Sequence, residues 1–345
     1  MPTGFVRVCI MAWQKSVRGK LSIFNKAIHI KLTLTFQQTN NSIAPILASI
    51  KWCIMNKLAE ELNSILEKNS PSLFSMLSDY GKRIYFPKGI ISQSAEAKKK
   101  AHKFNATIGI AKDENGPLFL DCIDHSFSDQ IDPKDVYPYA PSGGREDLKT
   151  LWQKRQKKQN PLLEKTDLFP PVVTSGLTHG LSLIGDLFLN KGDVVLTPDK
   201  LWGNYKLMWQ AKNEASLETY PLYGQDTLNL QGLKQGLKSR QGKKTLLVLN
   251  FPNNPTGYTP TEEEAYTIKD ILLEEAKAGS QLIVICDDAY FGMNYEQDNF
   301  PESILGLLHN LHENLLAVKI DGPTKELFVW GFRVGFLTFG VKGAS

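Results

Sequence analysis

The chain has 345 residues, of which 42% are hydrophobic and 22% are charged, and its net charge is +4. This length predicts one large domain or two ordinary ones, and the mild charge gives no argument for a nucleic-acid partner. Apolar runs fall short of the roughly 18 residues that a membrane span needs. The four cysteines are scattered, with no CxxC pair and no His/Cys cluster. This indicates a reducing compartment, taken here as the cytoplasm, and predicts no metal site.

The first 54 residues differ in composition from the remainder because they contain no Asp or Glu. Their basic residues are Arg7, Lys15, Arg18, Lys20, Lys26, Lys31 and Lys51. Three interpretations are open: an organelle transit peptide, a membrane-surface helix, or upstream sequence translated from a wrongly chosen start, with Met55 as the natural one. The third is favoured, because the stretch lacks the Arg richness of a transit peptide and a clean amphipathic period. We therefore expect residues 1–54 to be disordered or not part of the native protein.

The next segment combines helical and irregular patterns. Apolar positions from 55 to 80 recur at helical spacing, with a break at Pro71. Residues 81–103 are polar and lysine-rich, which predicts a solvated connection or an exposed helix. A turn at 113–116 then precedes a short predicted strand at 118–123. In this region Gly109 is either an ordinary loop glycine or a point where the backbone approaches a ligand closely.

From residue 172 onwards, short apolar runs alternate with helical patterns. Strands are predicted at 172–174, 194–197, 246–251, 282–286 and 315–320, and helices at 145–158, 179–189, 228–238, 262–277 and 304–310. Such alternation predicts an α/β fold: a mainly parallel central sheet between two layers of helices. In sheets of this kind, ligands bind at the carboxyl ends of the strands.

Polar side chains stand where these strands end. Asn254, Asp287, Tyr290 and Lys325 each follow an apolar run. A lysine at the tip of a buried strand loses its proton readily, because burial disfavours the ammonium form, and the neutral amine can form a Schiff base with an aldehyde. On its own, such a lysine is more often a solvated surface charge.

A phosphorylated aromatic aldehyde would use these groups together. The turn at Gly176, Leu177 and Thr178 opens a helix whose N–H groups can hold the phosphate, with Arg333 as the cation. The remaining assignments are Trp202 as the stacking partner of the ring, Asp287 as the partner of the ring nitrogen, Asn254 and Tyr290 as partners of the phenolic oxygen, and Lys325 as the partner of the aldehyde. A plain βα turn remains the alternative for the Gly176 segment.

Several motifs then occur in an order that resembles a known family. They are FNATIGIAKDENG, LWGNY, NNPTG, DDAY and a lysine-to-arginine spacing of eight residues, between about Asn105 and Phe339. They are similar to the motifs of pyridoxal-phosphate (PLP)-dependent aminotransferases of fold type I, class I/II, and most of all to those of aspartate aminotransferases. The resemblance implies PLP as the cofactor, an amino acid and a 2-oxo acid as substrates, and a homodimer.

The resemblance also implies roles for individual residues. Lys325 would form the internal aldimine and shuttle the substrate proton; with Asp287 and Tyr290 it makes up the expected catalytic set. The remaining implied contacts are Gly176, Leu177, Thr178 and Arg333 with the phosphate, Trp202 with the ring, Tyr205 with Asp287, Asn254 with the phenolate oxygen, Tyr139 with the phosphate of the partner subunit's site, and Gly109 with the substrate.

The sequence departs from the family pattern in two places. The serine that often precedes the lysine by three residues is replaced by Gly322; Thr324 is expected to compensate, whereas Asp321 would oppose phosphate binding if it pointed inwards. The chain ends at Ser345, before the arginine that clamps the substrate carboxylate and most of the small domain.

The expected organisation is therefore a basic extension at 1–54, N-terminal helices with a small-domain segment at 55–118, and a truncated PLP-binding large domain at 119–345. Two alternatives to an aminotransferase stay open. One is another PLP enzyme of the same fold, such as a lyase or a decarboxylase. The other is a catalytically inactive, truncated PLP-binding remnant.

Overall fold

The computed structural model describes residues 55–85, 90–103, 105, 107, 109–114, 116–127, 131–132, 137–225 and 227–340. The expectations for residues 1–54 lie outside this part of the chain. Met55 begins a compact unit that continues to the C-terminus. In the part of the chain that the structure describes, no helix is both long enough and apolar enough to cross a membrane.

Four helices open the described chain. They are α4 (Lys57–Asn69), α5 (Pro71–Met76), α6 (Asp79–Arg83) and α7 (Ile90–Lys100). The Asn56 side chain caps α4 by accepting a hydrogen bond from the Leu58 N–H at 2.9 Å. Pro71 stands in the first turn of α5, where its missing N–H leaves no hydrogen bond unmade. The predicted break at Pro71 is therefore a boundary between two helices.

The strand predicted at 118–123 is wrong. The two-residue strands β1 (Lys112–Asp113) and β2 (Gly116–Pro117) pair with each other, and the chain continues into α8 (Asp121–Asp124) and the 3-10 turn η1 (His125–Phe127). One further hydrogen bond across this pair follows Pro117, from the Leu118 N–H to the Ala111 carbonyl at 2.9 Å, and the backbone then bonds locally. The Leu120 carbonyl accepts from the N–H groups of Ile123 and Asp124 at 2.9 and 3.1 Å.

A seven-stranded sheet forms the centre of the domain, in the order β3-β11-β10-β9-β8-β4-β5. Its strands are β3 (Val172–Thr174), β4 (Val194–Pro198), β5 (Ser216–Tyr220), β8 (Lys244–Asn250), β9 (Gln281–Asp287), β10 (Leu315–Asp321) and β11 (Gly335–Gly340). A separate hairpin joins β6 (Tyr223–Gly224) to β7 (Thr227–Leu228). The strands from β5 to β10 run parallel, and β11 is antiparallel to both β10 and β3. Strand β11 was not predicted.

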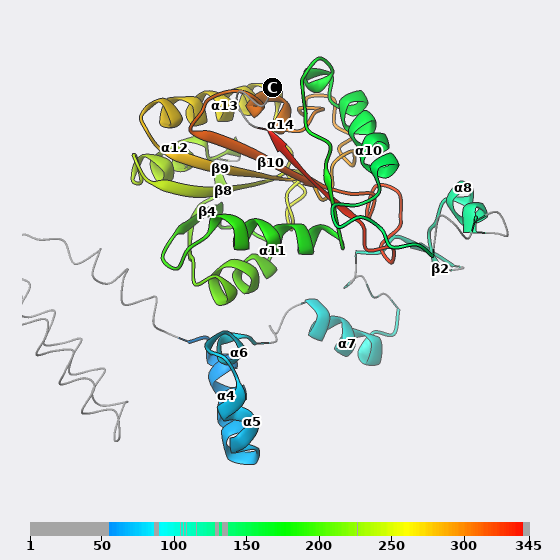
Figure 1. Ribbon diagram of the computed structural model, residues 1–345, viewed down its shortest axis with the longest axis vertical. Helices are drawn as coiled ribbons and strands as arrows, with labels where there is room; N and C mark the ends of the chain where they lie inside the picture. The colour runs from blue at the N-terminus through cyan, green and yellow to red at the C-terminus, as the bar shows by residue number, and fades with distance from the viewer. Residues whose placement is uncertain are drawn as a thin grey trace, which may run out of the picture. The chain divides into compact units, whose positions relative to one another are not determined.

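Helices cover both faces of this sheet, as Figure 1 shows. One face carries α11 (Leu177–Phe188) and the π-helix η3 (Lys206–Lys212), and the other carries α12 (Leu230–Lys238), α13 (Glu262–Lys277) and α14 (Leu305–Leu308). The helix α10 (Glu146–Gln159) and the turn η2 (Pro161–Leu163) precede β3. The prediction of an α/β fold with a mainly parallel sheet between two helical layers is confirmed.

The register of the sheet brings three strand ends to one level. Asn250 at the end of β8 pairs with Asp287 at the end of β9, and Asp287 pairs with Ile320 of β10. Side chains alternate between the two faces along a strand, so Ile320 and Ile285 pack in the same core as α11, whereas Ala317 and Val284 pack in the core under α13 and α14. Asp287 therefore points to the α11 face, and Asp288 to the other.

Candidate active site

A cavity of about 110 Å³ lies at the carboxyl ends of the parallel strands. Its lining consists of Leu177, Thr178, Leu181, Trp202, Tyr205, Asn250, Asn254, Asp287, Ala289, Tyr290, Thr324, Lys325 and Arg333. They lie in the first turns of α11, at the last residues of β8 and β9, and in the segments that follow β4, β8, β9 and β10, which are far apart in the sequence. The fold thus brings together nine of the residues predicted to bind the cofactor.

Lys325 lies in the loop after β10, four residues beyond Asp321. Its amine is 5.2 Å from the centre of the Tyr290 ring, and the side chain is half-buried. Burial lowers the pKa of Lys325; the Asp287 charge opposes this effect and the Arg333 charge adds to it. A larger fraction of this amine is therefore neutral, and nucleophilic, than in an exposed lysine.

Asp287 is the buried carboxylate of the cavity. The Tyr205 hydroxyl donates to its Oδ2 atom, and the Ala289 N–H donates to Oδ1 at 3.3 Å. Burial raises the pKa of Asp287 to about 6, opposed by the Tyr205 hydrogen bond and by the Lys325 charge. A buried carboxylate with so little compensation is well suited to hold a cationic group of a ligand.

The side chain of Tyr205 is itself fixed by aromatic packing. It stacks on Trp209, with ring centroids 4.8 Å apart and planes inclined by 11°, and contacts Trp202 edge-on at 5.6 Å. Trp209 is fully buried and donates from Nε1 to the Leu181 carbonyl of α11 at 3.1 Å. The π-helix η3, which begins directly after Tyr205, supplies Trp209. Short π segments of this kind are frequent at functional sites.

Two more predicted residues approach Asp287 and Lys325. The Asn254 N–H donates to Asn250 Oδ1 at 2.7 Å, and Asn250 Nδ2 donates to the Asp287 carbonyl at 2.8 Å. The pKa of Tyr290 is raised by burial and further by the Asp287 charge, so its hydroxyl stays protonated and can donate a hydrogen bond. Asn250, which the motifs did not single out, thereby ties the Asn254 loop to β9.

A candidate anion site lies at the start of α11. Its N-cap is Gly176, with φ of +82°, a glycine that has no side chain with which to cap the first N–H groups. A Cβ atom at Gly176 would lie 2.7 Å from Arg333 Nη2, so only glycine lets the guanidinium approach the helix so closely. Arg333 adopts a left-handed φ of +55°, an uncommon conformation for a non-glycine residue that clusters at functional sites. The helix N-terminus and the guanidinium together favour a phosphate or carboxylate.

The Asp321 carboxylate does not point towards this anion site. Trp152 Nε1 donates to its Oδ1 atom at 3.0 Å, and Lys319 Nζ lies 3.4 Å from Oδ2, on the opposite face of the sheet. The condition under which Asp321 would oppose phosphate binding is therefore not met. Thr324 lines the cavity, and its hydroxyl lies 3.5 Å from the Val334 carbonyl.

The glycine that replaces the family serine is packed against backbone. A Cβ atom at Gly322 would lie 2.9 Å from the Val334 carbonyl oxygen and 3.0 Å from Leu177 Cδ1. We therefore expect Gly322→Ser to destabilise the fold by about 1–3 kcal/mol, instead of adding a phosphate ligand. Urea unfolding measures this change. Gly331→Ser is the control, because a Cβ atom at Gly331 meets nothing within 4 Å; equal stability of the two variants would contradict the prediction.

In the part of the chain that the structure describes, three of the predicted site residues are absent from the cavity lining. Gly176 lies next to it as the N-cap of α11. Tyr139 is exposed, and its predicted contact is with another subunit. Gly109 is also exposed, in a loop before β1. The roles of Tyr139 and Gly109 remain predictions. His179 acts as a cap: its Nδ1 atom accepts from the Ser175 N–H at 3.1 Å.

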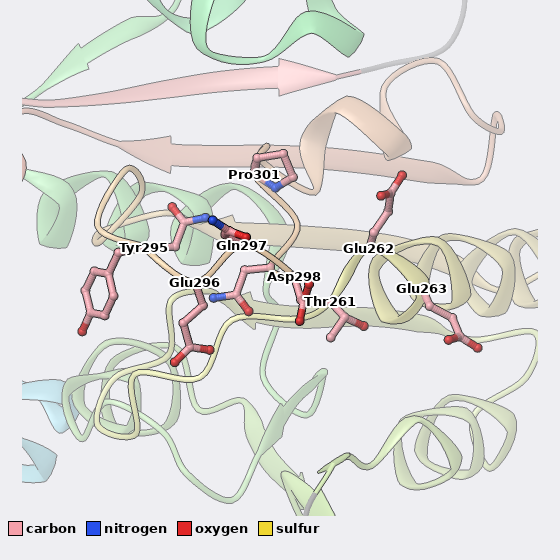
Figure 2. Close-up of a pocket in the computed structure, with 10 residues that line it drawn as sticks. Thr261, Glu262, Glu263, Tyr295, Glu296, Gln297, Asp298 and Pro301 are labelled. Atoms are coloured by element: carbon pink, nitrogen blue, oxygen red, sulfur yellow. The ribbon is translucent and has the colours of Figure 1, made fainter.

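A second hollow, of about 740 Å³, lies at the start of α13 (Figure 2). Carboxylates and amides line it, among them Glu262, Glu263, Glu296 and Asp298. In the part of the chain that the structure describes, no group of three or more His, Cys, Asp or Glu side chains is placed to hold a metal ion. This open acidic hollow contributes neither an amine nor a cation, so the strand-end cavity is the candidate active site.

The fold defines the chain as an α/β protein with a mainly parallel sheet and a ligand-sized cavity at its strand ends. An aminotransferase structure from Anaerococcus prevotii DSM 20548 superimposes with a TM-score of 0.69 at 21% identity, covering 78% of this chain and 67% of that one, which shows a shared fold. The model of the family described as aminotransferase class I and II matches residues 102–342. The chain therefore belongs to the aminotransferase class I and II family.

Curated relatives agree with this assignment. The aspartate aminotransferase of Bacillus subtilis (strain 168) is 27% identical over 208 residues, which cover 57% of this chain and 47% of that protein. The aspartate aminotransferase of Bacillus sp. (strain YM-2) is 28% identical over 202 residues, again 57% and 47% of the two chains. The chain spans about half the length of the curated relatives it matches.

Proposed function

We propose that this protein moves an amino group between an amino acid and a 2-oxo acid, with PLP as its cofactor. One observation carries the proposal: a lysine whose pKa is lowered by burial shares a small cavity with the buried carboxylate of Asp287 and with the anion site at Arg333. Membership of the aminotransferase class I and II family supports the same reaction.

The residues of the cavity match the chemical groups of PLP. Its phosphate would bind the N–H groups at the start of α11 and the Arg333 guanidinium, in the cradle that a side chain at Gly176 would fill. Its protonated ring nitrogen would bind Asp287, whose burial leaves the carboxylate in need of a positive partner. Trp202 would pack on the ring, and Asn254 and Tyr290 would bind the phenolic oxygen.

The bound cofactor supplies an aldehyde that accepts an amino group and a ring that withdraws electrons from the substrate. The chain supplies orientation and proton transfer. Lys325 Nζ takes the proton from the substrate α-carbon and can return it, because burial keeps its basicity below that of an exposed amine. Asp287, whose Oδ2 atom accepts from the Tyr205 hydroxyl, would stabilise the positive charge of the cofactor's ring nitrogen.

Further parts of the proposal concern the assembly and its location. We propose a homodimer in which Tyr139 reaches the phosphate of the partner subunit's site, and a substrate that lies against Gly109; both residues are exposed, which supports contacts outside their own loop. The scattered cysteines support a cytoplasmic location. The division into a segment at 55–118 and a PLP-binding domain at 119–345 also stays a proposal.

Covalent labelling tests the cofactor and the lysine together. PLP is added to the purified chain, the mixture is reduced with borohydride, and the labelled peptide is identified by mass spectrometry. We expect label on Lys325 in the unmodified chain, none at this position in Lys325→Ala, and unchanged Lys325 labelling in Lys191→Ala, whose exposed amine pairs with Glu214. Transfer of nitrogen-15 from a labelled amino acid to a 2-oxo acid then tests the reaction. Label spread over surface lysines without preference for Lys325 would refute the proposal.

A further inference from the structure

Lys319 is a buried charge outside the candidate active site. It lies in the middle of β10 with 0% of its surface exposed, and it points away from the cavity, to the face that packs under α14. Lysines are almost never fully buried unless they are paired. Lys319 Nζ donates to Asp288 Oδ2, lies 3.4 Å from Asp321 Oδ2 and sits 4.2 Å from the centre of the Phe291 ring.

The two carboxylates belong to the two strands that carry the proposed catalytic groups. Asp288 directly follows Asp287 at the end of β9, and its N–H extends the ladder by donating to the Ile320 carbonyl at 2.9 Å. Asp321 ends β10, four residues before Lys325. Lys319 therefore bridges the ends of β9 and β10 on the face opposite the cavity.

Helix α10 closes this cluster from outside the sheet. Trp152 Nε1 donates to Asp321 Oδ1 at 3.0 Å, and Gln156 Nε2 lies 3.2 Å from both Asp321 oxygens and 2.9 Å from Thr338 Oγ1 of β11. Gln156 is only 1% exposed. The Ser303 hydroxyl donates to Asp288 Oδ2 at 2.6 Å. Both carboxylates are thus held by neutral donors as well as by Lys319.

The same helix also holds the loop on the other side of Lys325. Glu326 accepts from Arg155 Nη2 at 2.7 Å and from Gln159 Nε2 at 3.0 Å. Its Oε1 atom also packs against Gly292, where a Cβ atom would lie only 2.9 Å away. The backbone that carries Lys325 is therefore fixed immediately after the lysine as well as four residues before it.

We propose that Lys319 is a positioning residue, which fixes Lys325 relative to Asp287 by pairing with Asp288 and Asp321 at the ends of the two strands. The inference rests on the proposed function, in which Lys325 and Asp287 bind the same cofactor. A buried ion pair is often no more stabilising than apolar side chains of the same volume, so stability alone is a weak reason for it. The directional contacts of Lys319 with the two carboxylates are instead suited to hold the loops after β9 and β10 in one arrangement.

Lys319→Met tests the proposal, with Lys244→Met as the matched control. Lys244 begins β8, at the end of the strand away from the cavity, where it donates to the Phe188 carbonyl at 2.9 Å and pairs with Asp193. Labelling of Lys325 by PLP and borohydride is followed against PLP concentration, well below the Tm of each variant. Thermal unfolding of the cofactor-free chains is measured in parallel. This separates a loss of positioning from a general loss of stability.

We expect Lys319→Met to slow the labelling of Lys325 by about 100-fold, since a displacement of roughly 1 Å has an effect of this size on reacting groups. Lys244→Met should lower the Tm and leave the labelling unchanged. If Lys319→Met does not fold, Asp321→Asn keeps the shape of the cluster, removes one charge, and should slow labelling several-fold. Two results would overturn the inference. One is a folded Lys319 or Asp321 variant that is labelled at the rate of the unmodified chain, and the other is a Lys244→Met variant that is slowed equally. Absence of label on Lys325 in the unmodified chain would instead overturn the proposed function, and this inference with it.

Discussion

Asp287→Asn is expected to lower the rate of amino-group transfer by about 1,000-fold while it makes the cofactor-free chain more stable above pH 6. The rate falls because an amide cannot supply the negative charge that stabilises a protonated ring nitrogen. The stability rises because Asp287 is a buried carboxylate with a raised pKa, so its ionisation opposes folding. The same side chain is thus expected to favour function and disfavour stability.

The sign of the pH dependence follows from the two pKa values. Asp287 has a pKa of about 6 in the folded chain, against 3.8 for an unperturbed aspartate. Between these values the folded chain retains a proton that the unfolded chain has released, so stability falls as the pH rises through this window. A shift of about two pKa units corresponds to about 3 kcal/mol. The amide introduced by Asp287→Asn accepts the Tyr205 hydrogen bond more weakly than a carboxylate does, which leaves an expected net gain of about 1–3 kcal/mol above pH 6.

Urea unfolding of the cofactor-free proteins at pH 4 and pH 8 measures this difference. The two chains should be similar in stability at the lower pH and differ at the higher one. Asp270→Asn is the control, since Asp270 is an exposed carboxylate that pairs with Lys269, and it should show neither effect. An Asp287→Asn variant that is less stable than the unmodified chain at pH 8 would show that burial does not penalise this carboxylate.

Trp209→Ala is expected to destabilise the fold by about 3–5 kcal/mol, the range for large aromatic side chains truncated in a core. Trp209 is fully buried between α11 and Tyr205, and its loss leaves a cavity beneath the Tyr205 ring. Tyr205 would then lose the surface that orients its hydroxyl towards Asp287. We therefore also expect weaker PLP labelling of Lys325 in the folded fraction.

Trp209→Phe distinguishes the contribution of the aromatic ring from that of the indole N–H. It keeps an aromatic surface against Tyr205 and removes the hydrogen bond to the Leu181 carbonyl, so a smaller loss of about 1–2 kcal/mol is expected. Labelling of Lys325 should be preserved. Urea unfolding and the labelling assay give both values. A Trp209→Ala variant within about 1 kcal/mol of the unmodified chain would exclude the role that we assign to this stack.

The sequence was sufficient to predict the elements that place the site. Apolar runs of strand length alternate with helical periods from residue 172, and the structure has β4, β8, β9, β10 and α13 where these patterns predict them. Because the ends of parallel strands meet at one edge, Asp287 and Lys325 could be expected to meet without knowledge of their contacts. The prediction used only local periodicity and the rule that ligands bind at the carboxyl ends of parallel strands.

Local sequence patterns could not predict contacts between segments that are far apart in the sequence. Lys319 appears as one polar residue in an apolar strand, and only its partners on β9 and β10 make it a buried cluster. The direction of Asp321 depends on Trp152 of α10, which no local pattern connects to β10. The error at 118–123 has a similar origin, since an apolar run forms a strand only where another strand lies beside it.

The place of β3 in the sheet has a consequence for how the protein assembles during synthesis. Strand β3 is at the edge, and its neighbour in the sheet is β11, the last strand of the described chain. Strands β4, β8, β9 and β10 can add to the growing sheet soon after each leaves the ribosome, whereas Thr174 must wait for Gly335. The candidate anion site, which starts two residues after β3, is therefore completed only after β11 has been synthesised, so we expect a nascent chain to hold an anionic ligand there only after that point.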